Sequence, residues 1–353
     1  MISQALVIPK ERTSEILNRL RDTGIINRDM KIGHIDDQVY IPITTEDLTQ
    51  YLPDINYEIL QFDFEQRHTR PASLKDALSQ LLPDLEPDIY QTSFDQIGTI
   101  AIIDLNDELV PYAETVGKAL MLSNPSITTV YRKSSKVDGL LRIRGLELIG
   151  GERLTETIHK EHGLNIAIDV EKAYFSPRLA TEHARITDLV PEGSLVLDMF
   201  GSLAPFALHL THDKDIEVDT LDINPHVPEL IRKSVDLNKL QGQINIYCQD
   251  AHQFAEEHDP AYYDYIIMNH PSGAFDFLMD AIQLVKTGGT IFYYDFVEIE
   301  NYQMRIHQKL EDFTTIDIDA IHVVRQSSPS EYHVCVSLLR SKREEMPDQI
   351  AHQ

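Results

Sequence analysis

The sequence predicts an α/β protein in which a Rossmann-like domain follows two small α+β domains. From residue 194 onward, five strand-like apolar runs alternate with helix-like segments: SLVLDM, IEVDTL, INIYC, DYIIM and TIFYYD. Two further runs, TTIDIDAIHVV and EYHVCVSLL, are strand-like and have no long helix between them. Because alternating strands and helices form a parallel sheet covered by helices, this half predicts a doubly wound sheet that ends in a strand pair.

The 353 residues leave room for two or three domains with cores of their own. The predicted domains are 1–64, 72–160 and 161–342, and a polar tail follows over 343–353. A polar, Pro-containing stretch at 66–72 is typical of a linker between the first two domains.

Each of the first two domains carries its own strand and helix patterns. In the first, ALVIP predicts a strand, ERTSEILNRLRDTG a helix that ends at Gly24, and MKIGHIDDQVYIPI two strands around a turn. In the second, SLKDALSQLLPDL and ELVPYAETVGKALMLSN predict helices, while QIGTIAIIDL and SITTVYRK each predict one strand. TIHKEHGLNIAIDV predicts a hairpin-like pair that leads into the third domain.

Composition argues against a membrane-spanning or disulfide-bonded protein. No apolar run approaches the length of a bilayer span, and the N-terminus has no apolar segment of the signal-peptide kind. Cys248 and Cys335 both lie in predicted strands, which suits a reducing compartment. We therefore expect a soluble cytoplasmic protein that makes no membrane contact and works as a monomer.

No metal site is expected either. The two cysteines form no CxxC pair, and His159, His162 and His183 lack the spacing of metal ligands. Each of these histidines is expected at the surface or in an ordinary hydrogen bond.

The net charge of −26, from 31 basic and 57 acidic residues, opposes nucleic-acid binding at long range, because phosphates are bound by Lys and Arg. Residues 131–153 are an exception. They hold six basic and three acidic side chains, a local surplus of three positive charges. This segment is therefore the expected contact with RNA, if RNA is a partner.

Acidic side chains end the first three strands of the predicted sheet. Asp198 ends the first, Asp222 in LDINP ends the second, and Asp250 follows the third. Ligands of such sheets bind outside the carboxyl ends of the strands, where a carboxylate can accept hydroxyl or amino groups. A strand-end Asp can also serve only as a helix or turn cap, but three in succession predict a ligand site.

One further pattern is more specific. YFSPRL begins at Tyr174, Glu182 follows eight residues later, and the next strand ends in DMF. With ALVIPKERTSEILNRLRDTGIINRD, RKSSKVDGLLRIRGLELIGGE, LDINP and NHPSGAFDFL, the chain resembles the archaeal and eukaryotic tRNA (guanine-N1)-methyltransferases that modify guanosine 37. The resemblance covers nearly the whole chain. It implies a class I S-adenosylmethionine (SAM) methyltransferase fold, SAM as methyl donor, and tRNA with guanosine at position 37 as substrate.

The resemblance also implies catalytic roles. Guanine N1 carries a proton that must leave before methyl transfer, and the family's general base falls on Glu182. Arg142 falls on the arginine that contacts guanine O6, where it would stabilise developing negative charge. Tyr174 would stack on or orient the base, and Asn269 with Pro271 would form the loop beside the target nitrogen. A surface Glu paired with a neighbouring arginine and a purely structural turn are the alternatives for Glu182 and Asn269.

The residues expected at the cofactor lie in the loops that follow the strands. They are Asp198, Phe200, Gly201, Asp222, Asn224, Asp250 and Asn269. The residues expected to bind RNA are basic and lie in the middle domain or just before the first strand of the sheet. They are Arg132, Lys133, Lys136, Arg144, Arg178 and Arg185.

The chain departs from the family in the loop after the first strand. The family reads D-M-F-A-G-V-G-P-F there, whereas Ser202 and Ala204 replace both glycines and Gly201 stands beside them. Glycine tolerates positive φ and leaves room for the methionine part of SAM, so a shifted loop or weakened SAM binding is expected. His270 also replaces the apolar middle residue of the family's N-L-P motif.

Two alternatives remain open from the sequence. One is a non-catalytic tRNA-binding homologue that has lost SAM. The other is a bifunctional member that also methylates a wyosine precursor at position 37. A related aminocarboxypropyl transferase fits less well, because YFSPRL and NHP match the methyltransferases.

Overall fold

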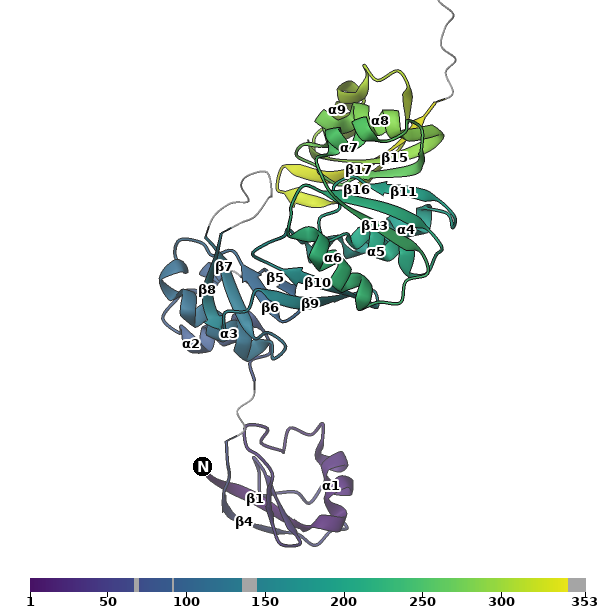
Figure 1. The fold of residues 1–353 in the computed structure, drawn as a ribbon. Coiled ribbons are helices and arrows are strands. Elements are labelled where there is room, and N and C mark those ends of the chain that lie inside the picture. The colour runs from purple at the N-terminus through teal and green to yellow at the C-terminus, as the bar shows by residue number, and fades with distance from the viewer. Residues whose placement is uncertain (67–69, 91, 135–144, 342–353) are drawn as a thin grey trace, which may run out of the picture. The chain divides into compact units, whose positions relative to one another are not determined.

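A computed structural model describes residues 1–66, 70–90, 92–134 and 145–341 (Figure 1). The chain divides into two compact units that separate between Ala72 and Ser73. Each unit has its own sheets and is described by itself.

The first unit is a four-stranded antiparallel sheet with a helix; three of these strands and the helix are predicted from the pattern, whereas β4 is not. The sheet order is β2-β3-β1-β4. Ile16 and Leu20 of the helix are fully buried in the core of this unit. The elements are β1 (Ile2–Pro9), α1 (Thr13–Leu20), β2 (Gly33–Ile35), β3 (Gln38–Pro42) and β4 (Glu58–Asp63).

The second unit begins with a smaller sheet of order β5-β6-β7-β8. Its elements are α2 (Leu74–Leu81), β5 (Phe94–Ile97), β6 (Ile100–Ile103), α3 (Ala113–Ser123), β7 (Thr129–Lys133) and β8 (Leu146–Gly151). The prediction of one strand for QIGTIAIIDL is wrong, because the segment is a tight hairpin of β5 and β6. Gly98 has a φ of +55° at the first position of the two-residue turn, a conformation that glycine adopts without strain.

The predicted hairpin between the two sheets is confirmed. It consists of β9 (Glu156–Glu161) and β10 (Leu164–Asp169). His162 and Gly163 form the turn, and both have positive φ, as a type I′ turn requires. The hairpin is linked to the smaller sheet by a hydrogen bond. The amide of Gly98, in the turn between β5 and β6, donates to Nδ1 of His159 in β9 over 3.2 Å.

The large sheet has seven strands in the order β13-β12-β11-β14-β15-β17-β16. The strand β17 runs in the opposite direction to the other six. The elements are α4 (Ala180–Leu189), β11 (Leu195–Asp198), α5 (Pro205–His212), β12 (Glu217–Asp222), α6 (Val227–Asp236), β13 (Gln243–Cys248), α7 (Ala251–Glu257), β14 (Tyr263–Met268), α8 (Leu278–Leu284), β15 (Val285–Glu298), α9 (Tyr302–Leu310), β16 (Ile316–Ser328) and β17 (Glu331–Arg340). The predicted doubly wound sheet and its closing strand pair are therefore confirmed.

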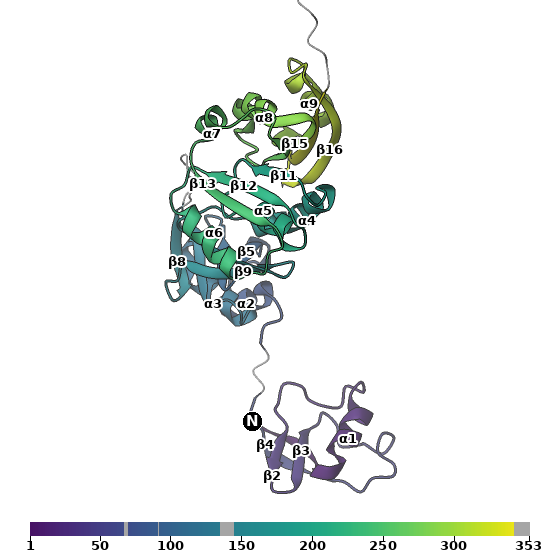
Figure 2. The same ribbon diagram turned by 45° about the vertical axis from the view of Figure 1, so that its right-hand side comes forward.

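Helices cover both faces of this sheet. The helices α4, α5 and α6 lie on one side, and α7, α8 and α9 lie on the other (Figures 1 and 2). Successive strand residues therefore enter different cores. Val196 and Ile267 pack with α5 and α6, while Leu197 and Ile266 pack with α7 and α8.

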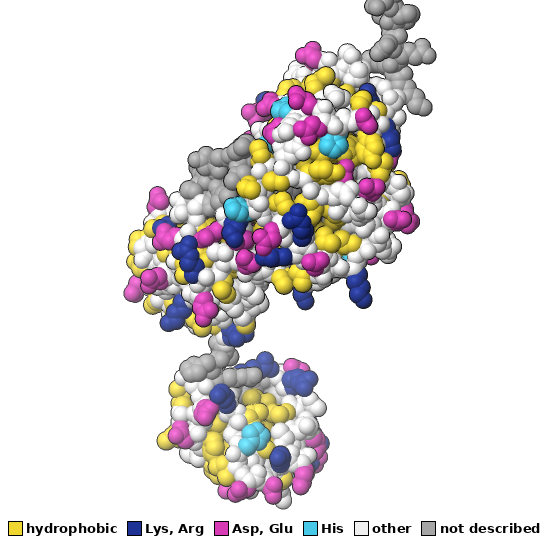
Figure 3. Space-filling model, viewed as in Figure 1, with side chains coloured by type: hydrophobic (Ala, Val, Ile, Leu, Met, Phe, Trp, Pro, Cys, Tyr) yellow, Lys and Arg dark blue, Asp and Glu magenta, His cyan; other side chains and the backbone are white. Residues whose placement is uncertain are grey.

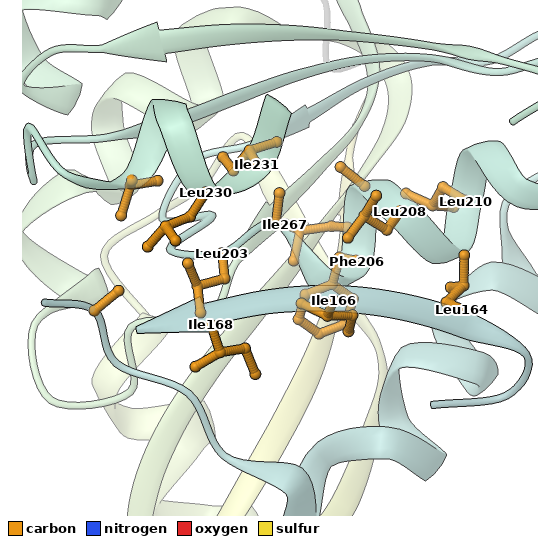
Figure 4. Close-up of a cluster of buried hydrophobic side chains, with 14 of the residues drawn as sticks. Leu164, Ile166, Ile168, Leu203, Phe206, Leu208, Leu210, Leu230, Ile231 and Ile267 are labelled. Carbon is orange, nitrogen blue, oxygen red and sulfur yellow. The ribbon is translucent and has the colours of Figure 1, made fainter. Parts of the chain in front are cut away.

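The hairpin closes the core on the α5 and α6 side. Figure 4 shows Ile166 and Ile168 of β10 lying against Phe206 and Leu203, which follow β11. The Ala167 amide also donates to the hydroxyl of Ser234 on α6 over 2.9 Å. These contacts fix the start of α5 relative to the segment that leads into α4.

The order of the strands creates a switch point between β11 and β14. From β11 the chain builds outward to β12 and β13, then returns to build β14 and β15 on the other side. The loops after β11 and β14 therefore diverge and leave a crevice at the carboxyl ends of the strands.

The loop after β11 adopts the conformation for which glycine is usually needed. Ser202 and Ala204 have φ values of +47° and +55°. For a residue with a side chain, this left-handed conformation is about 1–2 kcal/mol higher in energy than the right-handed one. Gly201 serves a different purpose, since it lies against Thr220 with no room for a side chain. Ser202 and Ala204, the two residues that stand where glycine is expected, thus carry the strain of this loop.

Gly201→Ala should destabilise the protein by about 1–3 kcal/mol, because the added Cβ would meet Thr220 Oγ1 at 2.0 Å. The free energy of unfolding in urea measures the effect.

Thr220→Ala provides the control. Thr220 Oγ1 is buried and has no hydrogen-bond partner among the described residues, so its removal should change stability little. The Gly201→Ala/Thr220→Ala double variant should recover most of the loss. A double variant with simply additive losses would contradict the steric explanation.

Candidate functional site

A cavity of about 210 Å³ lies at the carboxyl ends of β11 to β14. Its walls come from the segment before α4 and from the loops after successive strands, as the switch point requires. Eight of the predicted site residues line it: Tyr174, Phe200, Gly201, Asp222, Asn224, Asp250, Asn269 and Pro271.

Asp222 is held in place by two backbone amides. Its Oδ2 accepts from the Ser202 amide over 3.0 Å, and its Oδ1 accepts from the Asn224 amide over 2.8 Å. Each carboxylate oxygen can accept more than one hydrogen bond. Asp222 is thus oriented by the loops after β11 and β12, with its carboxylate on the cavity wall.

Asn224 and Asp250 each have a structural role in addition to their place in the cavity wall. Asn224 Nδ2 donates to the Lys172 carbonyl over 2.7 Å, and its Oδ1 accepts from the His226 amide over 3.0 Å. Asp250 caps α7 by accepting from the His252 amide over 2.9 Å. A cofactor contact of either side chain stays a prediction.

The NHPSG motif forms a compact turn after β14. The His270 amide donates to the Met268 carbonyl, and the His270 carbonyl accepts from the Ala274 amide over 2.7 Å. The His270 ring lies 5.2 Å from the Phe200 ring and lines the cavity with it. His270 therefore faces the site, which the sequence left undecided.

Asp198 lies behind the cavity wall and is fully buried. Both of its carboxylate oxygens lack a hydrogen-bond partner among the described residues. Burial raises the pKa of Asp198 to about 8, and the charge of Asp222 acts in the same direction. The carboxyl group is therefore largely protonated at neutral pH, and its predicted contact with a cofactor stays untested.

Glu182 is buried on α4 and tied to two neighbours. Arg185 donates to it through Nε and Nη2 over 2.7 and 2.6 Å, and Tyr294 donates through its hydroxyl over 2.7 Å. Burial raises the pKa of Tyr294 well above its usual value, so the phenol keeps the proton that it donates. Glu182 is not on the cavity wall, but Leu179 and His183, one turn before and one residue after it, are.

All four described cations among the predicted RNA-binding residues pair with carboxylates. The pairs are Arg132–Glu147, Lys133–Asp104, Arg178–Asp95 and Arg185–Glu182. A phosphate would have to compete with these carboxylates. Their RNA-binding role therefore stays a prediction, and for Arg185 the partner is the proposed base itself.

The remaining predicted cations, Lys136, Arg142 and Arg144, lie outside the described residues. Over the visible face of the second unit, acidic and basic side chains are interspersed (Figure 3). Among the helices formed by the described residues, none combines the length and apolar character of a membrane span.

The structure adds cavity residues that the sequence did not indicate. Arg325 of β16, His333 of β17 and Phe296 of β15 line the cavity. They lie within long strands, whereas the site residues predicted from the sequence lie at or after strand ends. No local pattern marks them, because the antiparallel return of β17 brings them to the site.

The spacing of the histidines along the sequence also did not reveal a buried cluster near the cavity. His183 lies with Glu161 and His209, and the three offer ligand atoms that all lie within 4.8 Å of one another. His183 is hydrogen-bonded through Nδ1 to Glu161 Oε1, one of the two environments expected for it, but the grouping of the three residues was not expected. The three residues come from α4, β9 and α5, so only the fold brings them together.

Comparison with known families agrees with this architecture. A profile of the TRM5/TYW2 methyltransferase domain matches residues 157–321. Profiles of the TYW2 N-terminal domain and the tRNA methyltransferase 5 N-terminal domain match residues 74–155 and 5–47.

A relative from Pyrococcus abyssi, the tRNA (guanine(37)-N(1))-methyltransferase Trm5b, is 33% identical over 337 residues, which are 94% of this chain and 97% of that protein. The chain belongs to the tRNA (guanine(37)-N1)-methyltransferase family. Among solved structures, the complex of aTrm5 with tRNALeu has a TM-score of 0.79 at 29% identity, over 95% of this chain and 98% of that one. Methanocaldococcus jannaschii Trm5 in complex with adenosine has a TM-score of 0.63 at 29% identity, over 96% and 100%.

In this family member, Asp198→Asn should remove a pH dependence of stability. The folded state holds a proton on Asp198 up to about pH 8, whereas the unfolded chain loses it near pH 4. Between these values the native state binds more protons, so wild-type stability falls as pH rises. Between pH 5 and pH 8, the stability of Asp198→Asn relative to wild type should therefore rise by about 3–4 kcal/mol.

Urea unfolding of both proteins at several pH values measures this difference. Asp188→Asn, an exposed carboxyl on α4, is the matched control and should show no such gain. A constant difference between Asp198→Asn and wild type would mean that Asp198 is ionised in the folded protein.

Proposed function

We propose that the protein transfers the methyl group of SAM to N1 of guanosine 37 in tRNA, in agreement with its family. The observation that carries the proposal is the cavity at the switch point. It gathers Tyr174, Asp222, Asp250, Asn269 and Pro271 from separate motifs. Two relatives, at 33% and 29% identity over nearly the whole chain, are named tRNA (guanine(37)-N(1))-methyltransferases.

The residues present fit SAM. The Asp222 carboxylate suits the ribose hydroxyls, and Asp250 suits the adenine amino group. Phe200, Ile223 and Phe277 supply apolar wall beside these acids. Ser202 and Ala204, where the family is expected to have glycine, both adopt positive φ. SAM, when bound, supplies an electrophilic methyl group.

Glu182 is the proposed general base that receives the N1 proton. Its carboxylate accepts hydrogen bonds from Arg185 and Tyr294 in this structure, and its neighbour His183 lines the cavity. Hydrogen bonds of a catalytic base often rearrange only in the substrate complex. The release of the Arg185 bonds when tRNA binds would free the carboxylate for the proton.

Arg142 is proposed to stabilise negative charge on guanine O6, and Asn269 to orient the base through its amide. Tyr174 has its carbonyl fixed by the Ser202 hydroxyl over 2.7 Å. This bond links the segment that would hold the base to the loop that would hold the cofactor, which favours a common geometry for both.

Glu182→Gln should lower the single-turnover rate of methyl transfer to an unmodified guanosine-37 transcript by about 10²–10⁴-fold. The amide keeps the volume and the acceptor for Tyr294 but cannot take the proton. Transfer from labelled SAM, followed over a range of salt, gives the rate. SAM affinity should be unchanged.

Three controls define the result. Asp188→Asn on the same helix should keep wild-type activity, and a transcript with adenosine at position 37 should receive no methyl group. Glu182→Gln turnover at the wild-type rate would rule out Glu182 as the base. Absence of both transfer and SAM binding in the wild type would instead favour a non-catalytic tRNA-binding protein.

Asp222→Ala should weaken SAM binding by at least about tenfold, because it removes a charged acceptor and leaves the Ser202 and Asn224 amides without their partner. Calorimetric titration measures the affinity. An unchanged affinity would remove Asp222 from the proposed cofactor site.

A further inference from the structure

A buried cluster of one carboxylate and two imidazoles lies behind the cavity wall. Glu161 Oε1 is 2.6 Å from His183 Nδ1 and 2.8 Å from His209 Nε2. Exposed fractions are 4% for Glu161, 1% for His183 and 7% for His209. Charged or polar groups this deep are found paired or bound to a metal.

The hydrogen bonds within the cluster leave part of it without partners. Glu161 Oε2 and His183 Nε2 are buried and have no hydrogen-bond partner among the described residues. A buried polar atom without a hydrogen bond destabilises the folded protein by about 1–3 kcal/mol. Glu161 Oε2, which lies 4.0 Å from His159 Nε2, is available to an additional ligand of the cluster, whereas His183 Nε2 lies on the ring edge away from the Nδ1 that faces Glu161.

The donor set suits a transition metal. Two imidazole nitrogens and one carboxylate oxygen are the protein ligands of many three-ligand zinc sites, which complete their coordination with water. Ligand atoms about 2.0 Å from a tetrahedral ion lie about 3.3 Å apart. The observed separations are shorter by 0.5–0.7 Å, so small side-chain rotations would open the cluster to fit an ion.

We propose that Glu161, His183 and His209 bind a divalent transition metal, with Zn²⁺ as the expected ion. The imidazole and carboxylate ligands favour zinc over Mg²⁺ or Ca²⁺, which prefer all-oxygen sites. His159 is not a fourth ligand, because its Nδ1 accepts from the Gly98 amide and its Nε2 therefore carries the proton when the ring is neutral. Water or the exposed His162, whose ring lies 5.5 Å from that of His209, completes the coordination.

The ion would join three elements that hold the active site. Glu161 ends β9, His209 lies on α5 after the β11 loop, and His183 follows Glu182 directly on α4. The His183 ring also packs edge-on against Phe206, with 4.6 Å between ring centroids. The metal thus has a positioning role for α4 and takes no part in methyl transfer.

Zinc binding can be measured without SAM or tRNA, so its outcome is independent of the proposed activity. The full-length protein is treated with chelator and dialysed, then titrated with Zn²⁺ by calorimetry and with Co²⁺ by its visible d–d absorption. We expect one ion per chain with a submicromolar Kd, and a rise in Tm of about 5 °C with excess Zn²⁺.

Glu161→Gln and His209→Gln should each weaken Zn²⁺ binding at least 100-fold and abolish the Tm shift. Glu161→Gln keeps an oxygen that can accept from both imidazoles, so a purely hydrogen-bonded cluster would survive this change. His307→Gln alters an exposed histidine on α9 and should bind Zn²⁺ as wild type does.

Two results would overturn the proposal. One is wild-type protein that binds no stoichiometric Zn²⁺ or Co²⁺, a measurement that needs no variant. The other is equal binding by wild type, Glu161→Gln and His209→Gln, which would place the ion elsewhere. Loss of binding in both cluster variants, with folding verified by circular dichroism, supports the site.

Discussion

The hydrogen bond from the Ser202 amide to Asp222 is the contact on which the site depends. It joins the loop after β11 to the end of β12. Gly201 makes it possible by lying directly against Thr220, and Ser202 and Ala204 hold the left-handed backbone that turns the chain into α5. The Ser202 hydroxyl then fixes the Tyr174 segment. A single tight loop thereby sets the positions of the proposed cofactor and base sites, and side chains without glycine's freedom can maintain it.

Polar groups in the helical layer of α4 and α5 are the second constraint. Glu182 is satisfied by Arg185 and Tyr294. Glu161 bonds to His183 and His209 through Oε1 alone, and its Oε2 has no hydrogen-bond partner among the described residues. The two networks lie on adjacent residues of α4. A buried carboxylate needs such partners, because an unpaired charge is strongly disfavoured in the interior. In the proposed mechanism, the same partners would keep Glu182 from acting as a base until the substrate changes its surroundings.

The acidic side chains of the protein also affect the cations that are expected to bind RNA. The described cations in the expected RNA-binding set are each paired with a carboxylate. Three of these pairs, all except Arg185–Glu182, are partly exposed. Pairs of this kind are weak and are screened by salt, so phosphates can replace their carboxylates at modest loss. If these cations bind RNA as predicted, local exchange of partners and not a uniformly basic surface would let a chain with net charge −26 hold tRNA.

The sequence by itself determined the doubly wound sheet, its closing strand pair and the strand-end residues Asp222, Asp250 and Asn269, because these follow from local periodicity and from where each strand stops. It also located the glycine substitutions at positions of positive φ. It misjudged QIGTIAIIDL, since one continuous apolar run does not show where a chain reverses. Only the tertiary structure decided that Arg325 and His333 reach the cavity, that Asp198 is buried behind it, and that Glu161, His183 and His209 meet. Those contacts join residues far apart in the chain, and local patterns carry no information about which distant segments will pack together.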